Sequence, residues 1–297
     1  MNTVKTGFFM MLLGGLLLAV GYLMGGMGGI IVALIFAFVL NFAMYWFSDK
    51  IALRMAGAHE ATPEAEPVLH SVVDEQVAKA GIPKPKVYII NNDSPNAFAT
   101  GRSPKHASIA ATTGIMRILN RDELGGVIAH ELAHVGNRDT LIMTIVATVA
   151  SALGMIAWMA QWSMIFGGFG GRDRDERGGG GGIIGIVGLL VIAILIPLIT
   201  TIIRLAISRT REYQADATGA RTSGTPEALA SALEKLHIGS KRKPMEANTA
   251  VAHLFIVEPM HKGAMGFFNA DSLMNLLSTH PPIAERVKRL RAVKEGW

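Results

Sequence analysis

Residues 130–134 read His130-Glu131-Leu132-Ala133-His134. On a helix, two histidines four positions apart project from the same face, so both imidazoles can reach one Zn²⁺ ion at about 2.0–2.1 Å. The carboxylate of Glu131 would then lie beside the open position of the metal, where it can take a proton from a water molecule. The stretch therefore predicts a zinc-binding helix that carries a general base.

The residues before this stretch support a helix. Asn120 with Glu123 three positions later forms a helix-start pattern, and Leu124, Val127, Ile128 and Val135 form an apolar stripe. Glu131 falls inside that stripe, and an unpaired carboxylate facing a core is costly. A metal site supplies the partner it needs; the alternative is two solvent-facing histidines beside an unrelated glutamate.

A catalytic zinc usually has three protein ligands, so a third must come from elsewhere. The metzincin pattern is excluded, because Asn137 and Thr140 stand where it requires Gly and His. Glu212 and Asp216 share one helical face, so one can bind the metal while the other accepts the N–H of a zinc histidine. The rival ligands are His253, His261 and His280.

The composition indicates a membrane protein. Only 17% of the residues are charged, and residues 6–48, 140–171 and 178–203 contain no Asp, Glu, Lys or Arg. Apolar runs of about 18 residues or more are typical of transmembrane helices. We therefore expect four of them, near 7–24, 30–47, 141–166 and 183–203, with the first pair broken by the glycines of 25–29.

Flanking basic residues predict the orientation. Those that favour a cytoplasmic location for both termini are Lys5, Lys50, Arg54, Arg138, Arg204, Arg209 and Arg211. A cleaved signal peptide is disfavoured, because a second span follows the first directly. The net charge of +5 follows from this topology and requires no nucleic-acid partner.

Two segments remain outside the membrane, 48–139 and 204–297, and together they are large enough for one domain interrupted by the hairpin 140–203. An antiparallel hairpin returns the chain to the face it left, which brings Glu212 back toward His134. We expect helices at 66–80, ended by Gly81 and Pro83, and from Thr225 to about 236, with short strands at 86–90, 97–100 and 107–113.

These features together resemble a known family. His130-Glu131-x-x-His134, Glu212-x-x-x-Asp216, four apolar spans and Ser278-Thr279-His280-Pro281-Pro282 are similar to the bacterial HtpX proteases of the M48 zinc metallopeptidases. The resemblance implies an α+β zincin-like (gluzincin) domain with one zinc per chain, Glu212 as third ligand and Asp216 orienting a zinc histidine. It also implies an inner-membrane endopeptidase with a cytoplasmic active site, acting on misfolded or damaged membrane proteins under stress.

Further roles rest on the same resemblance. His280, followed by Arg286, resembles the family's His-Pro element near the site, where it would stabilise the oxyanion; Tyr213 is the competing donor. Residues 95–99 resemble the family's substrate-binding edge strand, to which a peptide would add by backbone pairing. The alternative for that segment is an ordinary hairpin strand.

Two other functions were weighed. In an intramembrane metalloprotease the ligands sit within apolar helices, whereas charged residues flank this motif and place it at the membrane surface: Asp122, Glu123, Arg138 and Asp139. A zinc-stabilised membrane chaperone or assembly scaffold without hydrolysis is the second alternative. A scaffold has no need for Glu131, so replacing that residue discriminates between the two.

Overall fold

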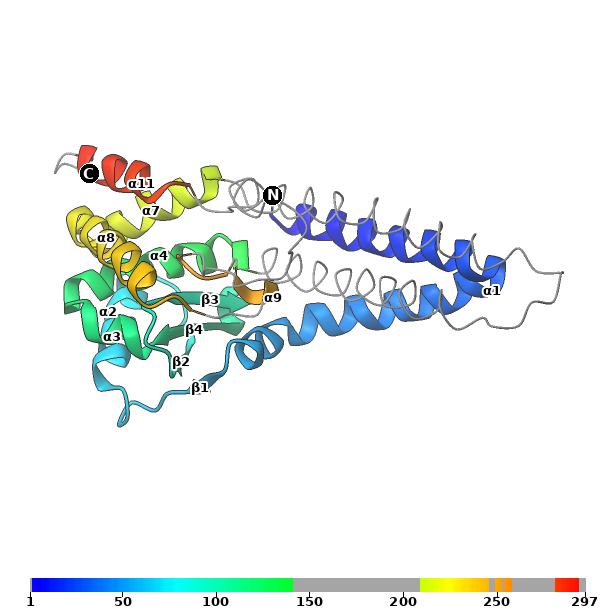
Figure 1. Ribbon diagram of the computed structural model, residues 1–297, viewed down its shortest axis with the longest axis horizontal. Coiled ribbons are helices and arrows are strands. Elements are labelled where there is room, and N and C mark those ends of the chain that lie inside the picture. The colour runs from blue at the N-terminus through cyan, green and yellow to red at the C-terminus, as the bar shows by residue number, and fades with distance from the viewer. Residues whose placement is uncertain (1, 141–208, 246–248, 253, 258–280, 294–297) are drawn as a thin grey trace, which may run out of the picture.

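The computed structural model describes residues 2–140, 209–245, 249–252, 254–257 and 281–293 (Figure 1). The predicted spans 141–166 and 183–203, the loop between them, and three of the histidines named above, His253, His261 and His280, lie outside the described residues.

The chain begins with one long helical element, α1 (Asn2–Met55). Figure 1 shows that its first half runs away from the rest of the structure and its second half returns to the sheet. Gly26, in the predicted break, has φ of +56°, a left-handed conformation that glycine adopts without strain. Considering the described residues alone, none of the helices qualifies by length and apolarity as a membrane span.

A four-stranded sheet follows, in the order β1-β2-β4-β3. Its strands are β1 (Ala58–Glu60), β2 (Lys86–Ile90), β3 (Ala97–Gly101) and β4 (Ala107–Thr112). β2 and β4 are parallel, whereas β1 pairs with β2 and β3 pairs with β4 in antiparallel register. The three strands predicted from the sequence are therefore confirmed, and β3 lies at an edge of the sheet.

Two helices pack near the sheet in the first half of the domain. α2 (Pro67–Ala80) begins one residue after the predicted start at 66 and, as predicted, ends at Gly81, which has φ of +65°. α4 (Arg121–Gly136) starts with the predicted capping box, in which Asn120 and Glu123 exchange two hydrogen bonds of 2.9 Å. A shorter helix, α3 (Thr113–Ile118), and the 3-10 turn η1 (Pro104–His106) complete this part.

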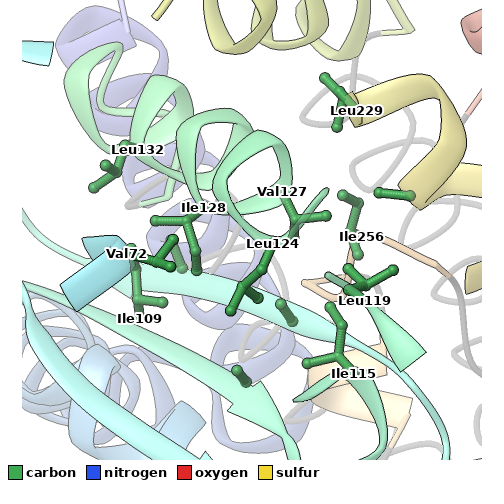
Figure 2. Close-up of a cluster of buried hydrophobic side chains, with 14 of the residues drawn as sticks. Val72, Ile109, Ile115, Leu119, Leu124, Val127, Ile128, Leu132, Leu229 and Ile256 are labelled. Atoms are coloured by element: carbon green, nitrogen blue, oxygen red, sulfur yellow. The ribbon is translucent and has the colours of Figure 1, made fainter. Parts of the chain in front are cut away.

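The apolar stripe of α4 forms the main core. Figure 2 shows Leu124, Ile128 and Leu132 directed toward Ile109 of β4 and Val72 of α2, all of them buried. Val127 is on the opposite side of the helix, toward Leu229 and Ile256 (Figure 2). Close packing of this kind fixes α4 against the sheet, and the metal-binding motif lies in the second half of the same helix.

The segments that follow residue 208 contribute four more helices to the described part of the chain. These are α7 (Arg209–Ser223), α8 (Pro226–Arg242), α9 (Thr249–Ala252) and α11 (Ile283–Ala292). α7 and α8 both pack on α4, and α11 packs on α7 and α8. α8 continues six residues beyond the predicted end near 236; it passes through Gly239 and ends two residues before Pro244.

Candidate metal centre

Three side chains from two helices converge on one point. His130 and His134 come from α4, Glu212 comes from α7, and their ligand atoms all lie within 4.8 Å of one another. The contact is close because Glu212, Asp216 and Gly219 occupy one face of α7, and the glycine lies against His130. The structure thus brings together the three residues that the sequence analysis proposed as ligands.

The separations match a metal coordination sphere. Oε1 of Glu212 is 3.4 Å from Nε2 of His134, and Oε2 is 3.8 Å from Nε2 of His130. Ligands about 2.0–2.1 Å from a tetrahedral ion would be about 3.3 Å apart. Two imidazoles and one carboxylate, all fully buried, are a donor set suited to Zn²⁺ with a fourth position open.

The other nitrogen of each histidine faces a carboxylate. Nδ1 of His134 is hydrogen-bonded to Oδ2 of Asp139 at 3.3 Å, and Nδ1 of His130 lies 3.0 Å from Oδ1 of Asp216. An ionised carboxylate accepts hydrogen bonds but cannot donate them, so each Nδ1 carries the proton. Each Nε2 is therefore left with its lone pair directed at the metal position, which is the tautomer a metal requires.

The site is strongly negative. Four buried carboxylates surround it: Glu131, Asp139, Glu212 and Asp216. Burial by itself lowers the pKa of His134, but Asp139 and Glu212 outweigh that effect and raise the pKa to about 10. With no metal bound, His134 would hold a second proton at neutral pH, because the electrostatic potential of the carboxylates favours a positive charge. A metal cation bound at the same place satisfies that potential.

Arg286 of α11 is completely buried beside the metal-binding residues, with Nη1 3.6 Å from Oε2 of Glu212. Its Nε and Nη2 donate to the two oxygens of Asp216 at 2.8 and 2.7 Å, and Nη2 is also 3.4 Å from Nε2 of His130. Burial raises the pKa of Asp216, but Arg286 and His130 bring that pKa down to about 2. Burial also lowers the pKa of His130, and Arg286 lowers it further against the effect of Asp216.

Glu131 faces the same cavity as the three ligand residues. The cavity measures about 10 Å³ and is also lined by Ala99, Thr140, Leu254 and Ile256. A space of that size holds about one water molecule or ion. Oε2 of Glu131 accepts a 2.8 Å hydrogen bond from the backbone N–H of Ala99 in β3. The general-base candidate is thereby held between the metal position and the edge strand.

Tyr213, the alternative oxyanion donor, is placed elsewhere. It follows Glu212 directly and so projects from a different face of α7. Its ring lies 3.7 Å from the guanidinium of Arg289, and it is not among the residues that line the cavity. His280, the first-choice donor, lies outside the described residues.

Three neighbours of the site were not assigned roles from the sequence. Asp139 had been interpreted only as a charge at the membrane surface, yet its position five residues after His134 is a signal that could have identified it. Arg286 was noted only for its distance from His280, and its pairing with Asp216 joins residues far apart in the chain. The hydrogen bond to Glu131 comes from the backbone N–H of Ala99, so the residue type at position 99 does not reveal it.

Comparisons with known proteins identify a family. A model of peptidase family M48 matches residues 63–294. A protein named "Protease HtpX homolog" from Thermodesulfovibrio yellowstonii is 52% identical over 297 residues and covers all of both chains. A second, from Pyrococcus furiosus, is 49% identical over 98% of this chain and 95% of its own.

A solved structure has a similar fold. The crystal structure of S. mikatae Ste24p matches with a TM-score of 0.52 at 19% identity, covering 97% of this chain. This chain spans 65% of that protein's length. At such low identity the match concerns the fold alone; together with the family match it supports a zincin-like fold.

Proposed function

This chain belongs to peptidase family M48 and is an HtpX-type metalloprotease, and we propose that it is an integral-membrane zinc endopeptidase. Its substrates are misfolded or damaged membrane proteins, cleaved at the cytoplasmic face of the bacterial inner membrane as part of a stress response. The observation that carries the proposal is the convergence of His130, His134 and Glu212 on one cavity that also contains Glu131.

One Zn²⁺ per chain would be held by Nε2 of His130, Nε2 of His134 and the carboxylate of Glu212. When bound, zinc supplies Lewis acidity, which polarises the scissile carbonyl and lowers the pKa of the attacking water. Asp139 and Asp216 hold the two histidines in the required tautomer.

Glu131 performs the proton transfers. Its carboxylate accepts a proton from the attacking water and delivers it to the nitrogen of the leaving amine. The N–H of Ala99 holds one carboxylate oxygen in position throughout. His280 donates a hydrogen bond to the developing oxyanion. Tyr213 is less suited to this role, because its ring packs against Arg289.

Membrane anchoring is supported by composition and by exposure. Residues 6–48 contain no charged side chain. Large apolar side chains along α1 are exposed, including Phe38 at 73% and Val32 at 68%. A large exposed apolar surface marks an interaction site, and a lipid bilayer would remove these side chains from water. Both termini and the metal site lie on the cytoplasmic side, and no nucleic-acid partner is required.

Replacing Glu131 tests the catalytic proposal. Glu131→Gln keeps nearly the same shape and removes no ligand, so the purified full-length protein should retain one zinc and still bind unfolded casein. Its kcat for casein should fall by at least about a hundredfold, because general acid–base catalysis contributes typically 10²- to 10⁴-fold. Glu64→Gln, at an exposed position, is the matched control and should cleave at the wild-type rate.

The scaffold alternative makes the opposite prediction. If Glu131→Gln holds one zinc and cleaves casein as fast as the wild type, the protease mechanism is wrong. A wild-type protein that binds zinc and casein but never cleaves would favour a zinc-stabilised chaperone or scaffold.

A further inference from the structure

The outer edge of β3 is defined by its pairing with β4. Thr112 N–H donates to Asn96 C=O, and Phe98 and Thr100 pair with Ala110 and Ser108 in the same antiparallel register. Because hydrogen-bonding direction alternates along a strand, the backbone groups of Ala97, Ala99 and Gly101 point away from β4. These are the groups that a peptide adding to the sheet would use.

Other parts of the same chain already bind this edge. The N–H of Ile256 donates to the carbonyl of Ala97 at 3.0 Å. The N–H of Ala99 donates to Glu131, and the hydroxyl of Thr140 donates to the carbonyl of Gly101 at 2.9 Å. The edge of β3 therefore does not present an open row of donors and acceptors in this conformation.

The side chain of Asn96 strengthens the contact between β3 and residues 254–257, which follow α9. Its Nδ2 donates to the carbonyl of Val257 at 2.6 Å, and its Oδ1 accepts from the N–H of the same residue at 3.2 Å. A side-chain amide that binds both backbone groups of one residue imitates the pairing of a β-strand. Residues 254–257 form a turn whose last two residues are held against the Asn96–Ala97 end of β3, where an incoming peptide would have to pair.

The side chains of this segment close the cavity. Leu254 and Ile256 line it together with the metal-ligand residues, and the space that remains is about 10 Å³. That volume admits roughly one water molecule. An extended polypeptide cannot enter it, although the hydrolysis of a peptide bond requires one.

The segment also contacts the end of α1. The rings of Phe255 and Phe98 meet edge to face, with centroids 4.9 Å apart. Leu254 and Phe255 share one buried apolar cluster with Ala52 and Leu53, the last buried residues of α1. The position of this segment is therefore coupled to the helix that we place in the membrane.

We propose that residues 254–257 form an inhibitory strap, which occupies the substrate-binding edge of β3 and must leave it before a polypeptide can pair there. The inference rests on the proposed endopeptidase function and concerns its regulation. The apparent affinity for substrate is then the intrinsic affinity multiplied by the fraction of molecules in which the strap is displaced. A shift of α1 that loosens its contact with Phe255 raises that fraction.

Hydrogen exchange of the zinc-loaded, detergent-solubilised Glu131→Gln full-length protein tests the displacement directly. In the protein alone, the amides of Ile256 and Val257 should exchange about tenfold or more faster than those of β4, because local opening is easier than global unfolding. Saturating unfolded casein should accelerate their exchange further and leave β4 unchanged. If the amides of residues 256 and 257 exchange as slowly as those of β4, or if casein slows their exchange, the segment is a fixed part of the cavity and the strap proposal is wrong.

A kinetic variant provides the second readout. Ile256→Pro removes the N–H bonded to Ala97, and kcat/KM for a short fluorogenic peptide should rise about three- to tenfold, as expected for the loss of one hydrogen bond. Ile238→Val, at an exposed position of α8 that does not line the cavity, is the control and should remain within about twofold of the wild type. An unchanged or lower kcat/KM in folded, zinc-loaded Ile256→Pro contradicts the proposal.

The two hypotheses fail differently. If the wild-type protein cleaves and binds casein but residues 256 and 257 stay protected, the strap is wrong and the endopeptidase function stands. If neither the wild type nor Ile256→Pro cleaves any peptide with zinc bound, the proposed function fails. In that case the exchange rates in the protein alone still decide whether the segment opens.

Discussion

Gly219 of α7 lies directly against the backbone of His130 on α4: a Cβ atom added to Gly219 would come within 2.8 Å of both N and Cα of His130. Backbone atoms cannot yield as a flexible side chain does, so any larger residue must push the two helices apart. Because Glu212 is on the same face of α7, the glycine determines whether the third ligand reaches the histidines.

Gly219→Ala should therefore weaken metal binding without touching a ligand. Overpacking of this kind costs about 1–3 kcal/mol, so we expect zinc affinity to fall roughly tenfold or more in a chelator competition assay. Gly136→Ala, on α4 where nothing lies within 4 Å of the added Cβ, should bind zinc as the wild type does. Equal zinc affinity in both variants would show that the helix contact does not position Glu212.

Asp139 should matter for the metal although it is not a ligand. Asp139→Ala removes the acceptor that holds Nδ1 of His134, and losses of this kind typically lower metal affinity or activity by about 10- to 100-fold. Asp122→Ala, an exposed position on the same helix, is the control and should leave zinc affinity unchanged. Wild-type zinc affinity in Asp139→Ala would mean that His134 is oriented by other contacts.

Arg286 is expected to be essential for stability. Arg286→Met leaves the buried carboxylate of Asp216 without its bidentate partner, and breaking a buried pair in this way costs about 3–5 kcal/mol. The melting temperature of the metal-free protein in detergent should drop by roughly 10 °C. Arg289→Met, on the exposed side of the same helix, should cause a much smaller change; similar shifts in the two variants would contradict a special role for Arg286.

Glu123 should make stability depend on pH. Burial raises the pKa of Glu123, but hydrogen bonds from Lys235 and from the Asn120 backbone lower it more, so the folded pKa lies below the usual 4.5. Its contribution is then complete above the unfolded pKa and is lost as the pH falls through the folded one.

The comparison with Glu123→Gln measures this contribution. At pH 7 the variant should be less stable by about 1–3 kcal/mol, the range for a buried charged hydrogen-bond acceptor that loses its partners. The difference should shrink as the pH falls below the usual pKa of 4.5, as followed by urea unfolding in detergent micelles. A difference that stays constant from pH 7 to pH 3 would show that the charge of Glu123 is not responsible.

The topology can be tested with single cysteines, because the chain contains none. A membrane-impermeant thiol reagent added to intact cells should label a cysteine at position 175 but not one at position 60 or 240. All three should react after the cells are permeabilised. Labelling at 60 or 240 with protection at 175 would reverse the proposed orientation.

Local patterns predicted those features that depend on neighbouring residues in the chain. The spacing of His130 and His134 places both on one face of a helix wherever that helix lies, because 3.6 residues per turn is a property of the backbone. Asn120 and Glu123 predicted the start of α4, and Gly81 predicted the end of α2, because caps act within a few residues. The strands at 86–90 and 97–100 were identifiable from composition and turn residues.

Only the tertiary structure decided how distant segments meet. The order of the strands, the contact of Gly219 with His130, the pairing of Arg286 with Asp216, and the closure of the β3 edge by Ile256 all join residues that no local pattern connects. Backbone contacts are also independent of residue type, so the sequence could not reveal that Ala99 holds Glu131. The sequence by itself determined the chemistry of the metal site, whereas packing between helices and strands decided its geometry and its access to substrate.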